Sequence, residues 1–210
     1  MALIELYSSE GCSSCPPAER WLGALRDDPG LWKNFVPVAF HVDYWNRLGW
    51  PDRFSKREFT QRQYAYAAAW GTGSVYTPCF VRDGAEWRER SRPEAAMTIA
   101  GVLRADFDGA VVCAEFTSSV SGAAKTAGVY EIHAAILGAG LVSKVTAGEN
   151  SGETLRHEFI ALALAHGPLG GGLALPVPRV AGVARHALAV WVTRRGELAP
   201  LQATGGWLAP

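Results

Sequence analysis

Apolar and polar residues follow two different periods along this chain, and the change falls near residue 108. In the first half, residues 2–7 and 36–43 form short apolar runs of the length that buried strands have. The segment between them opens with Pro16, which the first turn of a helix accepts, and carries apolar residues at helical spacing. The residues of this helical face are Ala18, Trp21, Leu22 and Leu25. A strand, a helix and a second strand are therefore predicted in this order.

Further elements are predicted before the change of period. Ser55 and Glu58 form a capping-box pattern at the start of a helix that ends at Gly71. A hairpin follows over residues 79–87, and a last helix over residues 91–107 completes the first half. The order β-α-β-α-β-β-α predicts an α/β sheet in which the first two strands are parallel and the hairpin is an antiparallel edge.

The second half has the alternation typical of strands. Residues 130–136 alternate between apolar and polar side chains, whereas residues 156–165 fit a strand or a helix. Further strands are predicted over residues 111–116, 141–146, 186–193 and 201–207. We therefore predict two domains, an α/β domain at residues 1–108 and a smaller all-β, sandwich-like domain at residues 109–210.

Charge and composition exclude several classes of protein. The 20 basic residues balance the 20 acidic ones, so no net field attracts nucleic acid or an anionic membrane. No apolar run approaches the roughly 20 residues that span a bilayer, and no signal-peptide pattern opens the chain. We predict a protein that binds no nucleic acid and has no membrane span.

Cys12 and Cys15 carry the clearest candidate chemistry. They form a C-x-x-C motif where the first strand gives way to the first helix. This spacing lets the two sulfurs form a reversible disulfide, and the helix N-terminus, with hydroxyl donors from Ser13 and Ser14, favours a thiolate at the first sulfur. We predict an exposed, nucleophilic Cys12 and a buried, resolving Cys15. Thiol–disulfide exchange needs no organic cofactor, and its partner is a protein or small-molecule disulfide or dithiol.

Two other functions stay open for these cysteines. C-x-x-C is also a spacing of metal ligands, and Cys79 offers a third sulfur for copper(I) or zinc. No second C-x-x-C and no H-x-x-x-H motif follows, so no residue is assigned as a metal ligand. In the other alternative the disulfide is structural, and the chain is a non-catalytic binding module.

Several segments resemble known families. They lie at residues 8–18, 41–45, 48–50, 75–78 and 148–152. A strand, a C-x-x-C at a helix start and a Thr-Pro pair before the third strand resemble the thioredoxin superfamily. The segments together resemble the bacterial domain-of-unknown-function family 1223 (DUF1223). The resemblance implies a thioredoxin-like first domain with a redox site of unknown substrate.

The resemblance also implies a location for the protein. Members of this family are commonly exported, which implies a periplasmic or exported protein. The chain as it stands, without a leader, indicates the cytoplasm instead.

Further roles around the cysteine pair follow from the resemblance. It implies that the Thr77–Pro78 bond is cis, that Pro78 packs against the sulfurs, and that the Thr77 backbone pairs with an extended substrate. Glu5, on the first strand, is a candidate for the buried acid that accepts the proton of the resolving thiol, or else an acid that faces solvent. The family usually has glutamine after the proline, where this chain has Cys79.

Aromatic residues complete the predicted site. Trp45 and Trp50 flank Gly49 in the loop after the second strand, where they either wall a groove beside the disulfide or pack in the core. The predicted catalytic residues are Cys12, Cys15, Pro78, Thr77 and Glu5. The predicted substrate-binding residues are Ser13, Ser14, Trp45, Trp50, Tyr76 and Cys79.

Overall fold

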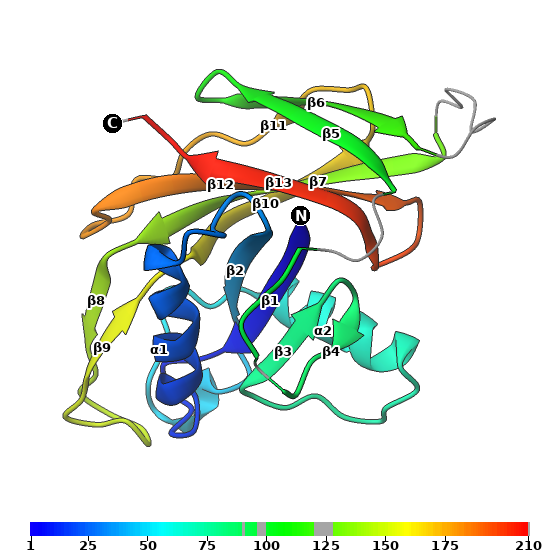
Figure 1. The fold of residues 1–210 in the computed structure, drawn as a ribbon. Coiled ribbons are helices and arrows are strands. Elements are labelled where there is room, and N and C mark those ends of the chain that lie inside the picture. The colour runs from blue at the N-terminus through cyan, green and yellow to red at the C-terminus, as the bar shows by residue number, and fades with distance from the viewer. Residues whose placement is uncertain (90, 96–99, 120–127, 210) are drawn as a thin grey trace.

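The computed structural model describes residues 1–89, 91–95, 100–119 and 128–209. Strands make up 42% and helices 14% of the structure, so the fold is mostly β. Its centre is a mixed sheet of eight strands in the order β13-β12-β7-β10-β2-β1-β3-β4 (Figure 1). The α-helices of the described residues are α1 (Pro16–Ala24) and α2 (Arg57–Ala69). No helix of these residues is long and apolar enough to cross a membrane.

The first half of the chain builds one end of this sheet. β1 (Ala2–Ser8) and β2 (Phe35–His41) are parallel neighbours, and α1 lies between them in the sequence. β3 (Cys79–Arg82) pairs antiparallel with β1, and β4 (Ala85–Glu86) closes the hairpin. The predicted parallel pair and antiparallel edge are confirmed. Two short 3-10 helices, η1 (Leu25–Asp27) and η2 (Asn46–Leu48), follow α1 and β2.

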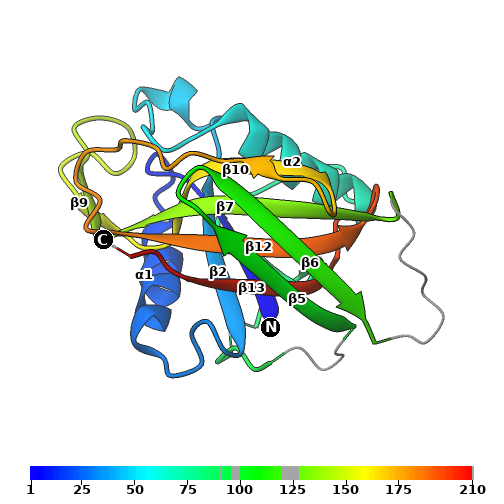
Figure 2. The ribbon, with the colours of Figure 1, turned by 90° about the horizontal axis from the view of Figure 1, so that it is seen from above.

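The two α-helices cover opposite faces of β1. The ring of Tyr7 lies 6.3 Å from that of Tyr66 in α2. Phe80, which pairs with Leu6, lies 5.2 Å from the ring of Trp21 in α1. Successive strand residues point to opposite faces, so α1 and α2 lie on opposite sides of the sheet (Figure 2).

The second half extends the same sheet. The second half contributes to this sheet the strands β7 (Tyr130–Ala139), β10 (Ile160–Pro168), β12 (Arg185–Arg194) and β13 (Pro200–Trp207). β10 joins β2 in parallel, where the Ala39 N–H donates a hydrogen bond to the Phe159 C=O at 2.8 Å. The predicted fold class, an α/β thioredoxin-like domain followed by a smaller all-β sandwich, is therefore wrong, because one sheet contains strands from both halves.

Smaller sheets flank the large one. β5 (Gly101–Phe107), β6 (Val111–Ser118) and β11 (Leu173–Ala174) form a three-stranded sheet in the order β11-β6-β5. β5 and β6 cross over β7, β12 and β13 (Figure 2). β8 (Leu141–Lys144) and β9 (Thr154–His157) form a two-stranded ribbon beside α1 (Figure 1).

The predicted last helix over residues 91–107 is a further error. Residues 101–107 form β5, which pairs along its whole length with β6, while residues 96–99 lie outside the described residues. Leu103 and Phe107 fit the spacing of a helical face, but they also fit the alternation of a strand. Gly101 permits the close pairing, because a Cβ there would lie 2.3 Å from the Thr117 carbonyl oxygen. Pairing with a distant strand decides between the two periods.

β12 shows how the sheet separates two apolar cores. Ala189 and Trp191 face the core that contains β1 and β2, whereas Val190 and Val192 face the core beneath β5 and β6. This alternation matches a strand that is covered on both faces. The boundary predicted at residue 108 remains a proposal about folding units. Expression of residues 1–108 alone tests it, since that fragment must fold with the β10 side of β2 unpaired.

Candidate functional site

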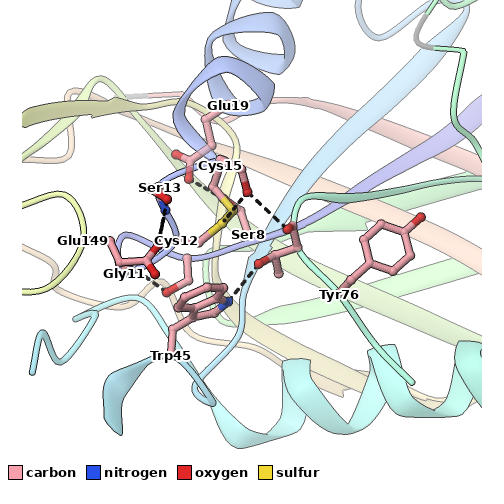
Figure 3. The surroundings of a disulfide bond; sticks show 12 residues. Ser8, Gly11, Cys12, Ser13, Cys15, Glu19, Trp45, Tyr76 and Glu149 are labelled. Carbon is pink, nitrogen blue, oxygen red and sulfur yellow. Dashed lines mark hydrogen bonds between the residues drawn. A yellow bond between two sulfur atoms is a disulfide. The ribbon is translucent and has the colours of Figure 1, made fainter. Parts of the chain in front are cut away.

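The Cys12–Cys15 pair forms a disulfide at the junction of β1 and α1 (Figure 3). The Cys12 N–H donates to the Ser9 C=O at 3.2 Å, and the Cys15 N–H donates to the Cys12 C=O at 3.1 Å, so a tight turn brings the sulfurs together. Cys15 is the N-cap of α1, and Pro16 follows as its first residue, where no backbone N–H is needed. The predicted placement at a helix start is confirmed.

Both sulfurs are covered in this oxidised form. Cys12 and Cys15 are each 0% exposed, whereas Ser13 and Ser14 between them are exposed. The prediction of an exposed Cys12 is therefore wrong for the disulfide state. The sequence places Cys12 on the turn, but the cover comes from segments far away in the chain.

One side of the cover is the segment before β3. The Ser14 Oγ lies 3.3 Å from the Cys12 Sγ and 3.4 Å from the Thr77 carbonyl oxygen. The Trp45 indole N–H donates to the Thr77 Oγ1 at 2.8 Å, which ties the loop after β2 to the same place (Figure 3). The Thr77–Pro78 bond is cis, as the resemblance implies.

The other side of the cover comes from residues 148–152. The Ser13 N–H and Oγ both donate to the Glu149 Oε2, at 3.0 and 2.7 Å (Figure 3). The buried Asn150 side chain donates to the carbonyl oxygens of Glu10 and Cys12 at 2.8 and 3.0 Å. Sequence reasoning missed both roles, although residues 148–152 are among the segments that carry the family resemblance.

The two tryptophans of the loop after β2 have different surroundings. Trp45 packs over Gly11, where an added Cβ would lie 3.1 Å from the Trp45 Cβ. The Trp50 indole N–H donates to the Glu10 Oε2 at 2.7 Å, and its Cβ lies close to Gly148. Trp45 therefore lines the turn that bears the disulfide, whereas Trp50 binds the carboxylate of Glu10.

Tyr76 and Cys79 line a separate pocket of about 200 Å³. Tyr76 is 44% exposed, and its hydroxyl donates to Glu86. Cys79 is buried, and burial raises its pKa to about 11. Cys79 is a free thiol, and no described contact joins its sulfur to the disulfide.

Cys79 is expected to react slowly with iodoacetamide at pH 7. With a pKa near 11, about one Cys79 thiol in ten thousand is ionised at that pH. Cys113 is a free and exposed cysteine of the same chain and serves as the control. Mass spectrometry of alkylated peptides measures both rates. Equal rates at Cys79 and Cys113 would contradict the shielding of Cys79.

Glu5 is buried in a cluster of its own. The Arg62 Nε and Nη2 donate to its two carboxylate oxygens at 2.7 and 3.0 Å. The hydroxyls of Tyr66 and Tyr7 donate to the same carboxylate at 2.6 and 2.9 Å. The alternative of a solvent-facing acid is wrong, because Glu5 is 1% exposed. Within the described part of the chain no contact joins Glu5 to the cysteine pair, and its role as a proton acceptor stays a prediction.

A second buried cluster lies where α1, β2 and β9 meet. His157 contacts Glu19 through Nδ1 and lies 3.1 Å from the Glu10 Oε1 through Nε2. The His41 Nδ1 lies 2.6 Å from the Asp52 Oδ2. All five side chains are buried, and the sequence predicted none of them as site residues.

Charge holds this cluster together. Burial favours the neutral form of His157, but Glu19 and Glu10 outweigh it and raise the pKa of His157 to about 10. Burial likewise opposes ionisation of Glu19, yet His41 and His157 lower its pKa below the usual value. The cluster therefore balances buried carboxylates against buried imidazoles.

Comparison with known proteins identifies the family. The model of the family "Protein of unknown function (DUF1223)" matches residues 3–193. The chain belongs to this family. No curated protein matches the chain.

Two solved structures are similar to this DUF1223 member in fold. A crystal structure of protein AGR_C_4864 from Agrobacterium tumefaciens has a TM-score of 0.67 at 22% identity and covers 99% of this chain and 93% of that one. HBP35 of Porphyromonas gingivalis has a TM-score of 0.62 at 14% identity and covers 99% of this chain and 74% of that one. At these identities the likeness concerns the fold alone.

In this DUF1223 member, the structure brings part of the predicted site together. The residues in contact around the disulfide are Cys12, Cys15, Ser13, Ser14, Thr77 and Trp45. Glu5, Trp50, Tyr76 and Cys79 have other partners.

Proposed function

We propose that this protein performs thiol–disulfide exchange through Cys12 and Cys15. The observation that carries the proposal is the disulfide at the start of α1, whose two cysteines flank two exposed serines. In the reduced form, the Cys12 thiolate attacks a substrate disulfide, forms a mixed disulfide and releases one substrate thiolate. The Cys15 thiolate then attacks the Cys12 sulfur, which releases the second substrate thiolate and leaves the Cys12–Cys15 disulfide. Two electrons pass to the substrate, and the reverse sequence oxidises a dithiol.

The local geometry supports Cys12 as the attacking thiol. Cys12 precedes α1, so its sulfur lies on the side of the positive end of the helix dipole. The Ser14 hydroxyl lies 3.3 Å from the Cys12 sulfur and is placed to donate to a thiolate there. The Cys15 C=O accepts from the Ala18 N–H at 2.9 Å, which fixes Cys15 as the cap of its own helix.

Exchange requires that the cover over the sulfurs open. Part of that cover rests on hydrogen bonds of the exposed Ser13 and Ser14, whereas the buried Asn150 side chain holds the turn from the other side. Exposed hydrogen bonds add little net stability, since water replaces the lost partner. Local opening of such a segment costs far less than global unfolding.

Glu149 is expected to slow the opening. Its carboxylate accepts both hydrogen bonds of Ser13 and places a negative charge beside the sulfur that must become a thiolate. Glu149→Ala is therefore expected to speed reduction by dithiothreitol about 3- to 10-fold. Glu153→Ala, which removes an exposed acid nearby, is the control. Equal reduction rates in the two variants would show that Glu149 does not hold the cover.

The substrate proposed here is a polypeptide disulfide. A pocket of about 370 Å³ beside the disulfide-covering segment is lined by Tyr76, Pro78, Phe80, Trp87 and Arg88. Its aromatic walls suit an apolar side chain of an extended segment, and Thr77 supplies the backbone beside it. A small-molecule disulfide remains the alternative substrate.

Insulin reduction tests the function directly. With dithiothreitol as the electron source, the wild-type protein is expected to accelerate precipitation of the insulin B chain catalytically. Cys113→Ser removes an exposed thiol outside the pair and is expected to keep the full rate. A wild-type rate equal to that of dithiothreitol alone would count against exchange and favour a structural disulfide in a binding module.

A further inference from the structure

Three buried side chains from distant parts of the chain converge beside α1. Glu19 lies on α1, and His41 and His157 are the last residues of β2 and β9. One ligand atom of each lies within 4.8 Å of those of the other two. Their exposed fractions are 8%, 0% and 1%.

Each histidine has its outer nitrogen bound to a carboxylate. The His41 Nδ1 lies 2.6 Å from the Asp52 Oδ2, and the His157 Nε2 lies 3.1 Å from the Glu10 Oε1. These contacts direct the other nitrogen of each ring, the His41 Nε2 and the His157 Nδ1, toward Glu19. The two rings stand nearly perpendicular, at 78°, so their inner nitrogens approach from different directions.

The inner nitrogen of His41, Nε2, lacks a hydrogen-bond partner among the described residues. It is fully buried, and its nearest charged group is the Glu19 Oε1 at 3.5 Å. A buried ring nitrogen without a partner carries a free-energy cost that a bound cation would remove. This nitrogen faces the Glu19 carboxylate.

The outer carboxylates are themselves held in place. Asp52 accepts from the N–H groups of Glu10 and Phe54 at 2.8 and 2.9 Å. Glu10 accepts from the Trp50 indole N–H at 2.7 Å. Carboxylates that fix the far nitrogen of a histidine, and are fixed in turn, are characteristic of the surroundings of metal-binding histidines.

We propose that Glu19, His41 and His157 bind one divalent transition-metal ion of the zinc class. Two imidazole nitrogens and one carboxylate oxygen form a donor set that zinc accepts in proteins. A water completes the coordination, and the Ser8 hydroxyl, which donates to the Glu19 Oε1 at 2.5 Å, orients the carboxylate. The ion joins α1, β2 and β9, and with them the base of the disulfide turn.

A small pocket borders α1 at Glu19. Glu19 lines a pocket of about 120 Å³ together with Pro16, Arg20 and residues 154–156. The site contains no cysteine, so metal binding and thiol–disulfide exchange can be tested separately.

Zinc titration of the full-length, metal-depleted protein tests the proposal. With its free thiols alkylated, the wild-type protein is expected to bind one Zn²⁺ per chain in isothermal titration calorimetry. Glu19→Gln and His157→Gln are expected to weaken binding more than about 100-fold, and Asp52→Asn, which acts through His41, about 10- to 100-fold. His166→Gln is the control, because His166 is an exposed imidazole bound to Glu131.

A spectroscopic measurement on the wild-type protein does not depend on the folding of variants. The Co²⁺-loaded protein is expected to show the visible bands of a four- or five-coordinate site without a sulfur-to-metal charge-transfer band. Three outcomes would overturn the proposal: no stoichiometric binding, a sulfur charge-transfer band, or folded variants that bind like the wild type. The cluster would then be a network of protein hydrogen bonds alone.

Discussion

Cys15→Ser is expected to capture its substrate as a mixed disulfide on Cys12. Attack by the Cys12 thiolate needs only the first sulfur, whereas release of the substrate needs the second. Cys12→Ser is expected to reduce insulin turnover to the uncatalysed background, because the variant lacks the attacking thiol that precedes Cys15, the N-cap of α1. Non-reducing electrophoresis with peptide mass spectrometry identifies the captured adduct.

Cys79 supplies the control for this capture. It follows Pro78 and is a buried free thiol of the first half, so its replacement tests whether a thiol other than Cys15 resolves the adduct. The double variant Cys15→Ser with Cys79→Ser is therefore expected to hold the adduct at least as long as the single variant. If neither variant holds a partner, the exchange mechanism proposed for Cys12 is refuted.

Arg62→Ala is expected to destabilise the fold by about 3–5 kcal/mol, the range for removing one partner of a buried ion pair. Arg62 donates two hydrogen bonds to Glu5, and both side chains are buried. Its loss leaves the Glu5 carboxylate without a counter-charge in the core between β1 and α2. Urea unfolding measures the change in the free energy of unfolding.

Arg26→Ala is the matched comparison. Arg26 forms an ion pair with Glu158 at 2.9 Å, but its side chain is 44% exposed. Exposed pairs contribute about 0–1 kcal/mol, so this variant is expected to change stability little. A loss for Arg62→Ala no greater than that for Arg26→Ala would contradict the structural importance assigned to the Glu5–Arg62 pair.

Local sequence signals predicted the elements around the disulfide. Pro16 after a C-x-x-C, and the helical face from Ala18 to Leu25, sufficed to place α1 between two parallel strands. The Asp83-Gly84 turn sufficed for the hairpin of β3 and β4. These signals lie within a few residues of the structure that they specify, so tertiary context did not override them.

Long-range pairing decided what the sequence did not reveal. β2 finds its second neighbour in β10, through Ala39 and residues 159–160, more than a hundred residues further along the chain. An apolar run in the sequence does not indicate which other strand will pair with it. The same holds for residues 101–107, whose spacing suits a helix or a strand until β6 is present.

In the candidate site, too, local sequence signals predicted some residues and long-range contacts brought in the others. Cys12 and Cys15 could be found from their spacing, whereas the groups that cover and support them could not. Glu149 binds Ser13 across a sequence separation of 136 residues, and Asn150 binds Cys12 across a separation of 138 residues. His157 is one of five scattered histidines, and only the fold brings it to Glu19.

The reduction potential of the Cys12–Cys15 pair tests the central claim most directly. The full-length protein is equilibrated in glutathione or dithiothreitol redox buffers, and the oxidised fraction is read from the masses of the alkylated peptides. Thiol–disulfide exchange predicts one reversible two-electron transition between about −270 and −120 mV. A disulfide that stays oxidised in buffers below about −300 mV would behave as a structural bond and contradict the proposed function.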